Sequence, residues 1–142
     1  MPLVSITRLR VRSWRYLPMF FLQAVRSARQ AAAAEGNVSV RVLRDSRSTF
    51  WTATVWTNET SMKQFILAGV HRGVMRKLLD WCDEAAVVHW HQESADPPTW
   101  PEAYARLRGD GRRSKVNHPS DAHTSFDFPE PRAGPSREAR IK

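Results

Sequence analysis

The sequence contains a single cysteine, Cys82, among 142 residues, and it has no long apolar run. One cysteine excludes an intramolecular disulfide and argues against a cysteine-based zinc site. This cysteine usage fits a reducing cytoplasm, which is where we expect the protein to work. A membrane-spanning helix needs about 18 or more consecutive apolar residues, so the sequence predicts no membrane span.

The N-terminus carries only part of the pattern of a signal peptide. Arginines precede an apolar stretch over residues 17–22, and small residues follow near Ala28. A signal peptide needs an apolar core of about 7–15 residues, and Arg26 and Arg29 interrupt this one. The pattern therefore argues against secretion.

Positive charge is concentrated toward both ends of the chain. The formal net charge is +8, with +7 in residues 1–50, −2 in residues 51–96 and +3 in residues 97–142. A basic surface attracts nucleic acid or anionic ligands, although a high-GC genome produces the same arginine bias without a functional cause. No nucleic-acid-binding motif accompanies the charge, so nucleic acid ranks last among the candidate partners.

Apolar residues alternate with strand spacing in four segments and recur with helix spacing in two. We expect strands over 3–11, 38–44, 49–56 and 86–92, and helices over 16–34 and 58–83. The second helix contains Gly69 and Gly73 around His71, and glycine favours a kink or a restart there. The order β-α-β-β-α-β is the ferredoxin-like plan, an α+β fold in which two helices cover one face of a four-stranded antiparallel sheet.

Four polar residues, 45–48, join the two middle strands. A four-residue turn pairs Val42 with Trp51 and places the apolar faces of both strands under the helices. The helices would then cover Val38, Val40, Val42, Trp51, Ala53, Val55, Val88 and Trp90. The opposite face would hold Arg41, Phe50, Thr52, Thr54, His89 and His91. That face is too apolar for water and too polar for a core, so we predict a homodimer in which a second copy encloses it as a cavity.

The last third of the sequence differs from the rest. Residues 99–102 form a capping box, and Trp100, Tyr104 and Leu107 make an apolar stripe on a helix too short to be stable undocked. Residues 111–115 form a basic turn that could hold an anion or could simply be a solvated loop. We divide the chain into a ferredoxin-like domain (1–94), an extension with a short helix (95–128) and a tail (129–142) whose composition predicts disorder.

Residues 55–75 contain the pattern Val55-Trp56-x-Asn58, then Phe65, Gly69-x-His71 and Met75, followed by a strand. Together with Trp81-Cys82-Asp83-Glu84-Ala85 and His89-Trp90, this pattern resembles the dimeric α/β-barrel superfamily, which includes antibiotic-biosynthesis monooxygenases and haem-degrading monooxygenases. The nearer resemblance is to a branch related to spheroidene monooxygenase. It covers about residues 3–93 and implies a barrel of two protomers with a pocket between the sheet and the second helix.

The resemblance implies a monooxygenase-like enzyme that oxidises an apolar small molecule. In haem-degrading relatives the histidine matching His71 ligates iron, and a nearby tryptophan, here Trp56 or Trp51, ruffles the macrocycle. The asparagine of their first strand has no counterpart, because Ser5 or Thr7 stands there. In cofactor-free relatives the deprotonated substrate activates oxygen itself, which requires a base and a dry pocket. The cofactor is accordingly none or haem.

We predict His71 and Trp56 as catalytic residues, with His71 as the only metal ligand if haem is bound. The predicted pocket lining consists of Arg41, Phe50, Thr52, Thr54, Trp81, His89 and His91. His71 could instead have a structural role and cap the helix kink. Cys82 could be a nucleophile or a small buried apolar residue. His89 and His91 could bind a metal together, but no third ligand is placed. The alternative function is a non-catalytic protein that binds a small molecule or haem on the same fold.

Overall fold

The structure is a computed structural model that describes residues 1–132, 134 and 137–142, without the side chains of residues 69–72. Its strands form one sheet in the order β5-β4-β1-β3-β2-β6. The four central strands are β1 (Leu3–Val11), β2 (Asn37–Asp45), β3 (Thr49–Trp56) and β4 (Cys82–His91), and all neighbours are antiparallel. This arrangement confirms the predicted ferredoxin-like α+β fold.

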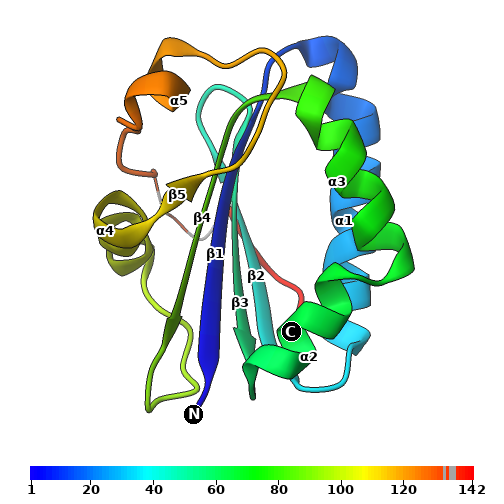
Figure 1. The fold of residues 1–142 in the computed structure, drawn as a ribbon, viewed down its shortest axis with the longest axis vertical. Helices are drawn as coiled ribbons and strands as arrows, with labels where there is room; N and C mark the ends of the chain where they lie inside the picture. The colour runs from blue at the N-terminus through cyan, green and yellow to red at the C-terminus, as the bar shows by residue number, and fades with distance from the viewer. Residues whose placement is uncertain (133, 135–136) are drawn as a thin grey trace.

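Three helices cover one face of the sheet (Figure 1). They are α1 (Leu17–Ala33), which follows a 3₁₀ turn, η1 (Trp14–Tyr16), then α2 (Glu59–Ile66) and α3 (Gly69–Trp81). Asn58 caps α2, as its side-chain oxygen accepts a hydrogen bond from the backbone N–H of Ser61. The second predicted helix is thus two helices, and the break falls at residues 67–68, directly before Gly69. No helix in the described part of the chain is long and apolar enough to cross a membrane.

The helices of the C-terminal third lie on the opposite face of the sheet, and its two short strands extend the sheet at either edge (Figure 1). This third contains α4 (Trp100–Asp110), β5 (Arg112–Arg113), α5 (Asp121–Ser125) and β6 (Glu138–Arg140). The apolar stripe of α4 docks there, with Trp100, Ala103 and Leu107 buried. Disorder is the wrong prediction for the end of the tail, because β6 pairs with the edge strand β2. An unpaired edge of β2 offers main-chain hydrogen bonds that composition alone does not reveal.

The hairpin between β2 and β3 differs from its predicted register by one residue. Asp45 pairs with Thr49 and Leu43 pairs with Trp51, so the connecting loop has three residues rather than four. Arg47 and Ser48 both have positive φ, 58° and 57°. Left-handed backbone is uncommon for residues other than glycine, and nothing in the sequence marks these two for it. The predicted pairing of Val42 with Trp51 is therefore wrong.

A register slip of one residue exchanges the two faces of a strand. Trp51, Ala53, Val55, Val88 and Trp90 consequently pack under the extension rather than under the helices. Phe50, Thr52, Thr54 and His89 lie on the helix side, and Phe50 packs against Phe20 of α1. The face of the sheet opposite the helices is covered by the chain's own extension. In the predicted homodimer a second copy covers this face, which the extension occupies instead.

The described residues form three apolar clusters. The largest lies between sheet and extension and includes Trp51, Trp90, Trp100, Leu107 and Phe128. On the helix side, one cluster gathers around Trp56 and Phe65 at one end of the sheet and reaches Val40 and Val42 of β2, and another gathers around Phe20 and Cys82 at the other end. Between them, β1 and β3 carry hydroxyl side chains on this side of the sheet.

Candidate functional site

The middle of the helix-facing sheet surface is lined by hydroxyl groups. Ser5 of β1 is flanked by His89 of β4 and Thr54 of β3 in one row of the sheet. In the next row, Thr7 pairs with Thr52. We call Ser5, Thr7, Thr52 and Thr54 the hydroxyl patch. It is a neutral, polar surface between the two apolar clusters on that side, with the imidazole of His89 at its edge.

Residues in the second row of the patch remain partly exposed although helices cover this face. Val87, Thr7, Thr52 and Val42 cross the sheet side by side, and all four are only half-buried. Ser5 and Thr54 in the neighbouring row are 9% exposed. Side chains in the centre of a helix-covered sheet are normally buried. Solvent therefore reaches the sheet between the two layers at this row, and a small molecule could do so too.

His89 is the one described titratable side chain in the rows of the patch. Burial lowers the pKa of His89, the charge of Arg112 lowers it further, and Glu59 opposes both. A lowered pKa keeps the imidazole neutral at pH 7 and leaves one ring nitrogen free to accept a proton. Chemically, the patch offers hydrogen-bonding hydroxyls next to a neutral base.

The structure brings together four of the predicted lining residues: Phe50, Thr52, Thr54 and His89. Trp56 is fully buried, stacks on Phe65 with ring centroids 5.3 Å apart, and donates its indole N–H to Thr54 at 2.9 Å. It therefore forms the wall next to the patch. The side chain of His71 lies outside the described residues.

The other predicted lining residues lie apart from the patch. Trp81 stacks on Tyr16 at the end of α3, with centroids 6.4 Å apart. His91 is exposed at the end of β4. Arg41 lies on the opposite face and pairs with Glu138 of β6 at 3.7 Å. The one-residue register shift explains Arg41, since it reverses the faces of β3 relative to β2.

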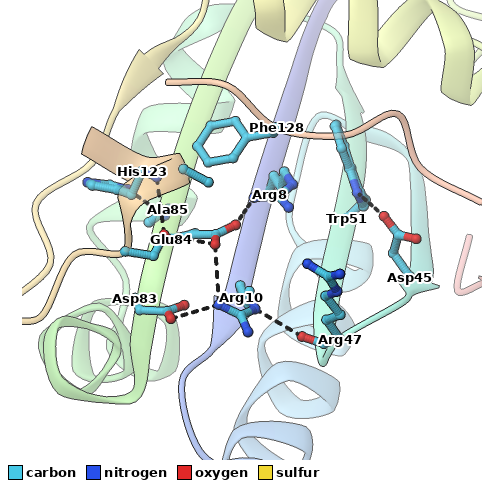
Figure 2. Close-up of polar contacts among 12 residues, drawn as sticks. Arg8, Arg10, Asp45, Arg47, Trp51, Asp83, Glu84, Ala85, His123 and Phe128 are labelled. Carbon is cyan, nitrogen blue, oxygen red and sulfur yellow. Dashed lines mark hydrogen bonds and ion pairs between the residues drawn. The ribbon is translucent and has the colours of Figure 1, made fainter. Parts of the chain in front are cut away.

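The opposite face holds a buried ion pair under the extension (Figure 2). Arg8 of β1 donates to Glu84 of β4 at 2.7 Å, and both residues are nearly inaccessible, 2% and 4% exposed. The guanidinium of Arg8 also lies 4.2 Å from the ring centroid of Phe128. Ser120 of the extension donates its hydroxyl to Glu84 at 2.8 Å. The extension is thus held to the sheet by charge-assisted hydrogen bonds as well as apolar contacts.

The ionisation of this cluster follows from its partners. Burial alone would raise the pKa of Glu84, but hydrogen bonds from Arg8 and Ser120 and the charges of Arg8 and Arg10 outweigh it and lower the pKa. Burial raises the pKa of Asp83, although Arg10 donates to it at 2.9 Å. His123 of α5 accepts the backbone N–H of Ala85 through Nδ1 at 3.2 Å, and burial and the charge of Arg113 lower its pKa. Neutral His123 is the form that docks.

Sequence reasoning missed Arg8, Glu84 and His123. Arg8 stands in an arginine-rich stretch whose charges look solvated, and Glu84 follows a helix end, where acids are common. Only the pairing of β1 with β4 brings the two partners of the ion pair, Arg8 and Glu84, together on one face of the sheet. A usable signal exists in the alternation of β1, where Val4, Ile6 and Arg8 share one face.

The lining of the hydroxyl patch tests the expectation of haem. Among the described residues on this surface there are hydroxyls and one imidazole, but no cationic side chain that would pair with the propionates. The described residues also contain no group of three or more metal-ligating side chains. Cys82 is fully buried, and burial and the charge of Asp83 raise its pKa to about 12, which leaves it a protonated thiol. The described donors match an uncharged polar group of a ligand. His71, the sole iron ligand predicted for haem, lies outside the described side chains, so the expectation of haem stays a prediction.

Two hollows lie elsewhere on the surface. One, of about 330 Å³, lies between the end of α1 and α2 and is lined by Gln30, Ala33, Ala34, Glu35, Ser61, Gln64, Phe65 and Ala68. The other, of about 440 Å³, is lined by Arg113, Ser114, Lys115, Val116, Pro119, His123 and Thr124. The second contains residues 113–115 of the basic turn, for which the sequence leaves open an anion site or a solvated loop. Neither hollow includes a residue of the predicted pocket.

Comparison with solved structures places this fold among known ones. A conserved protein from Methanosarcina mazei Go1 superposes with a TM-score of 0.59 at 14% identity, covering 66% of this chain and 94% of its own. SnoaB, a cofactor-independent oxygenase from Streptomyces nogalater, gives 0.52 at 16% identity over 66% and 94%. An antibiotic biosynthesis monooxygenase gives 0.58 at 7% identity over 65% and 99%. The predicted resemblance to the antibiotic-biosynthesis-monooxygenase fold is confirmed.

About a third of the chain has no counterpart in these structures. The shared part is about as long as the segment that contains strands β1–β4 and helices α1–α3. Among curated proteins, none matches this sequence. A protein-family model matches residues 21–139, which include both the helix layer and the extension. The extension is thus part of the family's own domain, and the chain belongs to the family described as Domain of unknown function (DUF3291).

Proposed function

We propose that this protein is a monooxygenase-like enzyme that oxidises an uncharged, largely apolar small molecule between the helix layer and the sheet. The observation that carries the proposal is the half-buried row of Val87, Thr7, Thr52 and Val42 beneath the helices. Next to it stands His89, which burial keeps neutral. The likeness of the fold to a cofactor-independent oxygenase supports the reaction class.

The chemistry proposed for this site needs no bound metal. Neutral His89 accepts a proton from an acidic C–H of the substrate, and the resulting carbanion or enolate passes one electron to O₂. The substrate radical and superoxide combine, the protonated imidazole returns its proton to give a hydroperoxide, and loss of water from the hydroperoxide leaves a carbonyl that holds one oxygen atom of O₂. The hydroxyl patch donates hydrogen bonds to the developing anion, and a bound substrate would displace the solvent that reaches this row. The role of His71 as base or iron ligand stays a prediction, as does the catalytic role of Trp56, and His89 is proposed as base in addition.

Oxygen consumption tests this proposal directly. Purified protein is supplied with a panel of hydroxylated aromatic and polyene substrates, and turnover is followed with an oxygen electrode. His89→Ala should lower kcat by about 100-fold or more, the usual contribution of a general base. His118→Ala, which changes an exposed histidine in the extension, serves as the matched control. If His89→Ala and His118→Ala leave the same activity, His89 is not the base.

A second candidate function is non-catalytic binding of a small molecule at the same patch. The neutral hydroxyl lining favours it, because hydroxyls recognise a polar ligand without promoting a reaction. Ligand-dependent protection against thermal unfolding without oxygen uptake would identify this function. Replacement of both Thr52 and Thr54 by valine should then abolish the protection, whereas His89→Ala should leave most of it.

A further inference from the structure

The outer side of η1 and the first half of α1 exposes large apolar side chains. Trp14 is 76% exposed, Phe21 59%, Leu22 50% and Met19 46%. We call these four residues the α1 patch. Met19 and Leu22 are three residues apart and share one side of the helix, while Phe21 lies next to Leu22. Single exposed apolar residues are ordinary, but four within nine residues, on one turn and the helix that follows, form a surface that favours an apolar partner.

Arginines surround the α1 patch and no acidic residue offsets them. Arg15 follows Trp14 directly, Arg26 and Arg29 lie on the next turns of α1, and all three are exposed. None of them belongs to an ion pair in the part of the chain that the structure describes. The first acidic residue of the whole sequence is Glu35. The surface therefore combines apolar and aromatic side chains with uncompensated positive charge.

We propose that the α1 patch attaches the protein peripherally to an anionic membrane surface. Aromatic and aliphatic side chains of an interfacial helix insert at the boundary between headgroups and acyl chains, and arginines beside them pair with anionic headgroups. The α1 patch supplies both parts, and it lies in the helix layer, away from the covered face of the sheet (Figure 1). This attachment is independent of what the hydroxyl patch binds.

The charge also argues against two other partners for the α1 patch, a second copy of the chain and nucleic acid. In a two-fold pair of copies, each α1 patch would face its own equivalent, and Arg15, Arg26 and Arg29 would meet like charges without an acid to offset them. Nucleic acid would match the charge, but bases stack on aromatic rings, and Met19 and Leu22 would gain little from them. An anionic lipid surface satisfies the aliphatic and the cationic groups together.

Sedimentation with vesicles tests the proposal on the full chain. The vesicles contain phosphatidylcholine alone, or equal parts of phosphatidylcholine and phosphatidylglycerol. The wild type should sediment with the anionic vesicles and stay in solution with the neutral ones. Phe21→Ser/Leu22→Ser should lower the partition coefficient by about tenfold or more, because two inserted side chains are lost. Arg26→Glu/Arg29→Glu should lower it by a similar factor through charge alone.

The matched control is Arg108→Glu/Arg112→Glu, which makes the same charge change at exposed residues of the extension. It should keep nearly wild-type partition, and all variants should keep the wild-type circular dichroism because every changed side chain is exposed. A wild type that ignores anionic vesicles overturns the proposal. So does an equal loss in the control, which would show attraction by net charge only. A wild-type dimer that Phe21→Ser/Leu22→Ser converts to a monomer, or retention of a random oligonucleotide instead of vesicles, assigns the surface to another occupant.

Discussion

The two faces of the sheet are built on opposite principles. The face under the extension is dry, with Trp51, Val55, Leu107 and the ion pair of Arg8 and Glu84 all nearly inaccessible. The face under the helices has apolar clusters toward its two ends and half-buried threonines beside valines in its middle. One face contributes most of the packing, whereas the other keeps solvent-accessible polar groups that contribute little to stability.

This difference concerns the face that the resemblance predicts to be covered by a partner. In the superfamily that the sequence resembles, a second protomer is implied to cover the sheet. Here the chain covers that face itself with α4 and α5, while β6 extends the sheet at the edge of β2. We infer that the extension takes the place of the partner protomer on this face.

The largest expected effect is that of removing the extension. A chain ending at residue 94 exposes Trp51, Trp90 and the ion pair of Arg8 and Glu84 to solvent. The buried side chains Trp100, Leu107 and Phe128 alone contribute about 1.5–3 kcal/mol each. We expect the shortened chain to associate through the bared face, measured by light scattering as a larger particle mass, relative to chain mass, than that of the full chain. A shortened chain that stays a folded monomer would contradict the comparison of the two faces.

The next largest effect is expected at the buried ion pair. Glu84→Ala leaves Arg8 charged and unpaired inside the protein, which typically costs about 3–5 kcal/mol of the free energy of unfolding. Glu59→Ala breaks an exposed pair with Lys63 on α2 and is the matched control, with an expected loss of about 0–1 kcal/mol. Urea unfolding of both variants makes the measurement. Equal losses would mean that Arg8 finds water or another partner once Glu84 is gone.

The sequence predicts the order of elements and most of their bounds, since alternation and helix spacing are local properties. It also predicts the docking of α4 from the stripe of Trp100, Tyr104 and Leu107. It does not predict which face of β3 meets the helices, because Phe50 and Trp56 on one side are as apolar as Trp51 and Val55 on the other. Left-handed backbone at Arg47 and Ser48 decides that choice, and neither residue is of a type that favours it.

The candidate site was predicted in part for the same reason. Alternation predicts that Thr52 and Thr54 share one face of β3, and the prediction places His89 of β4 on that same face, whichever face it is. The face itself, and therefore the exclusion of Arg41, depends on the register. The ion pair of Arg8 and Glu84 joins residues far apart in the sequence, and only strand pairing makes them neighbours.

A smaller effect is expected from pH on the face under the extension. Burial lowers the pKa of His123 below the ordinary value of 6.5. The contribution of neutral His123 to stability is therefore complete above pH 6.5 and is lost as the pH falls from there through the lower pKa of the folded state. His123→Gln should reduce the fall in melting temperature between pH 7 and pH 5, measured by calorimetry, whereas His118→Gln in the same extension should not. The pKa of His89 is lowered as well, so its contribution to the pH dependence has the same sign.

The smallest effect on stability is expected at the hydroxyl patch, where the effect on function should be greatest. Thr52→Val removes a half-buried hydroxyl and keeps the shape of the side chain, so the free energy of unfolding should change by less than about 1 kcal/mol. The same exchange at Thr49 of β3, which is 2% exposed, removes a buried hydroxyl and should lower the free energy of unfolding more. If the space beneath the helices is the binding site, Thr52→Val should weaken ligand binding or turnover while Thr49→Val should leave both unchanged in the folded fraction. Titration calorimetry and chemical unfolding of the two variants separate these outcomes. Thr52→Val with normal binding and a large loss of stability would reverse the roles assigned to the two faces.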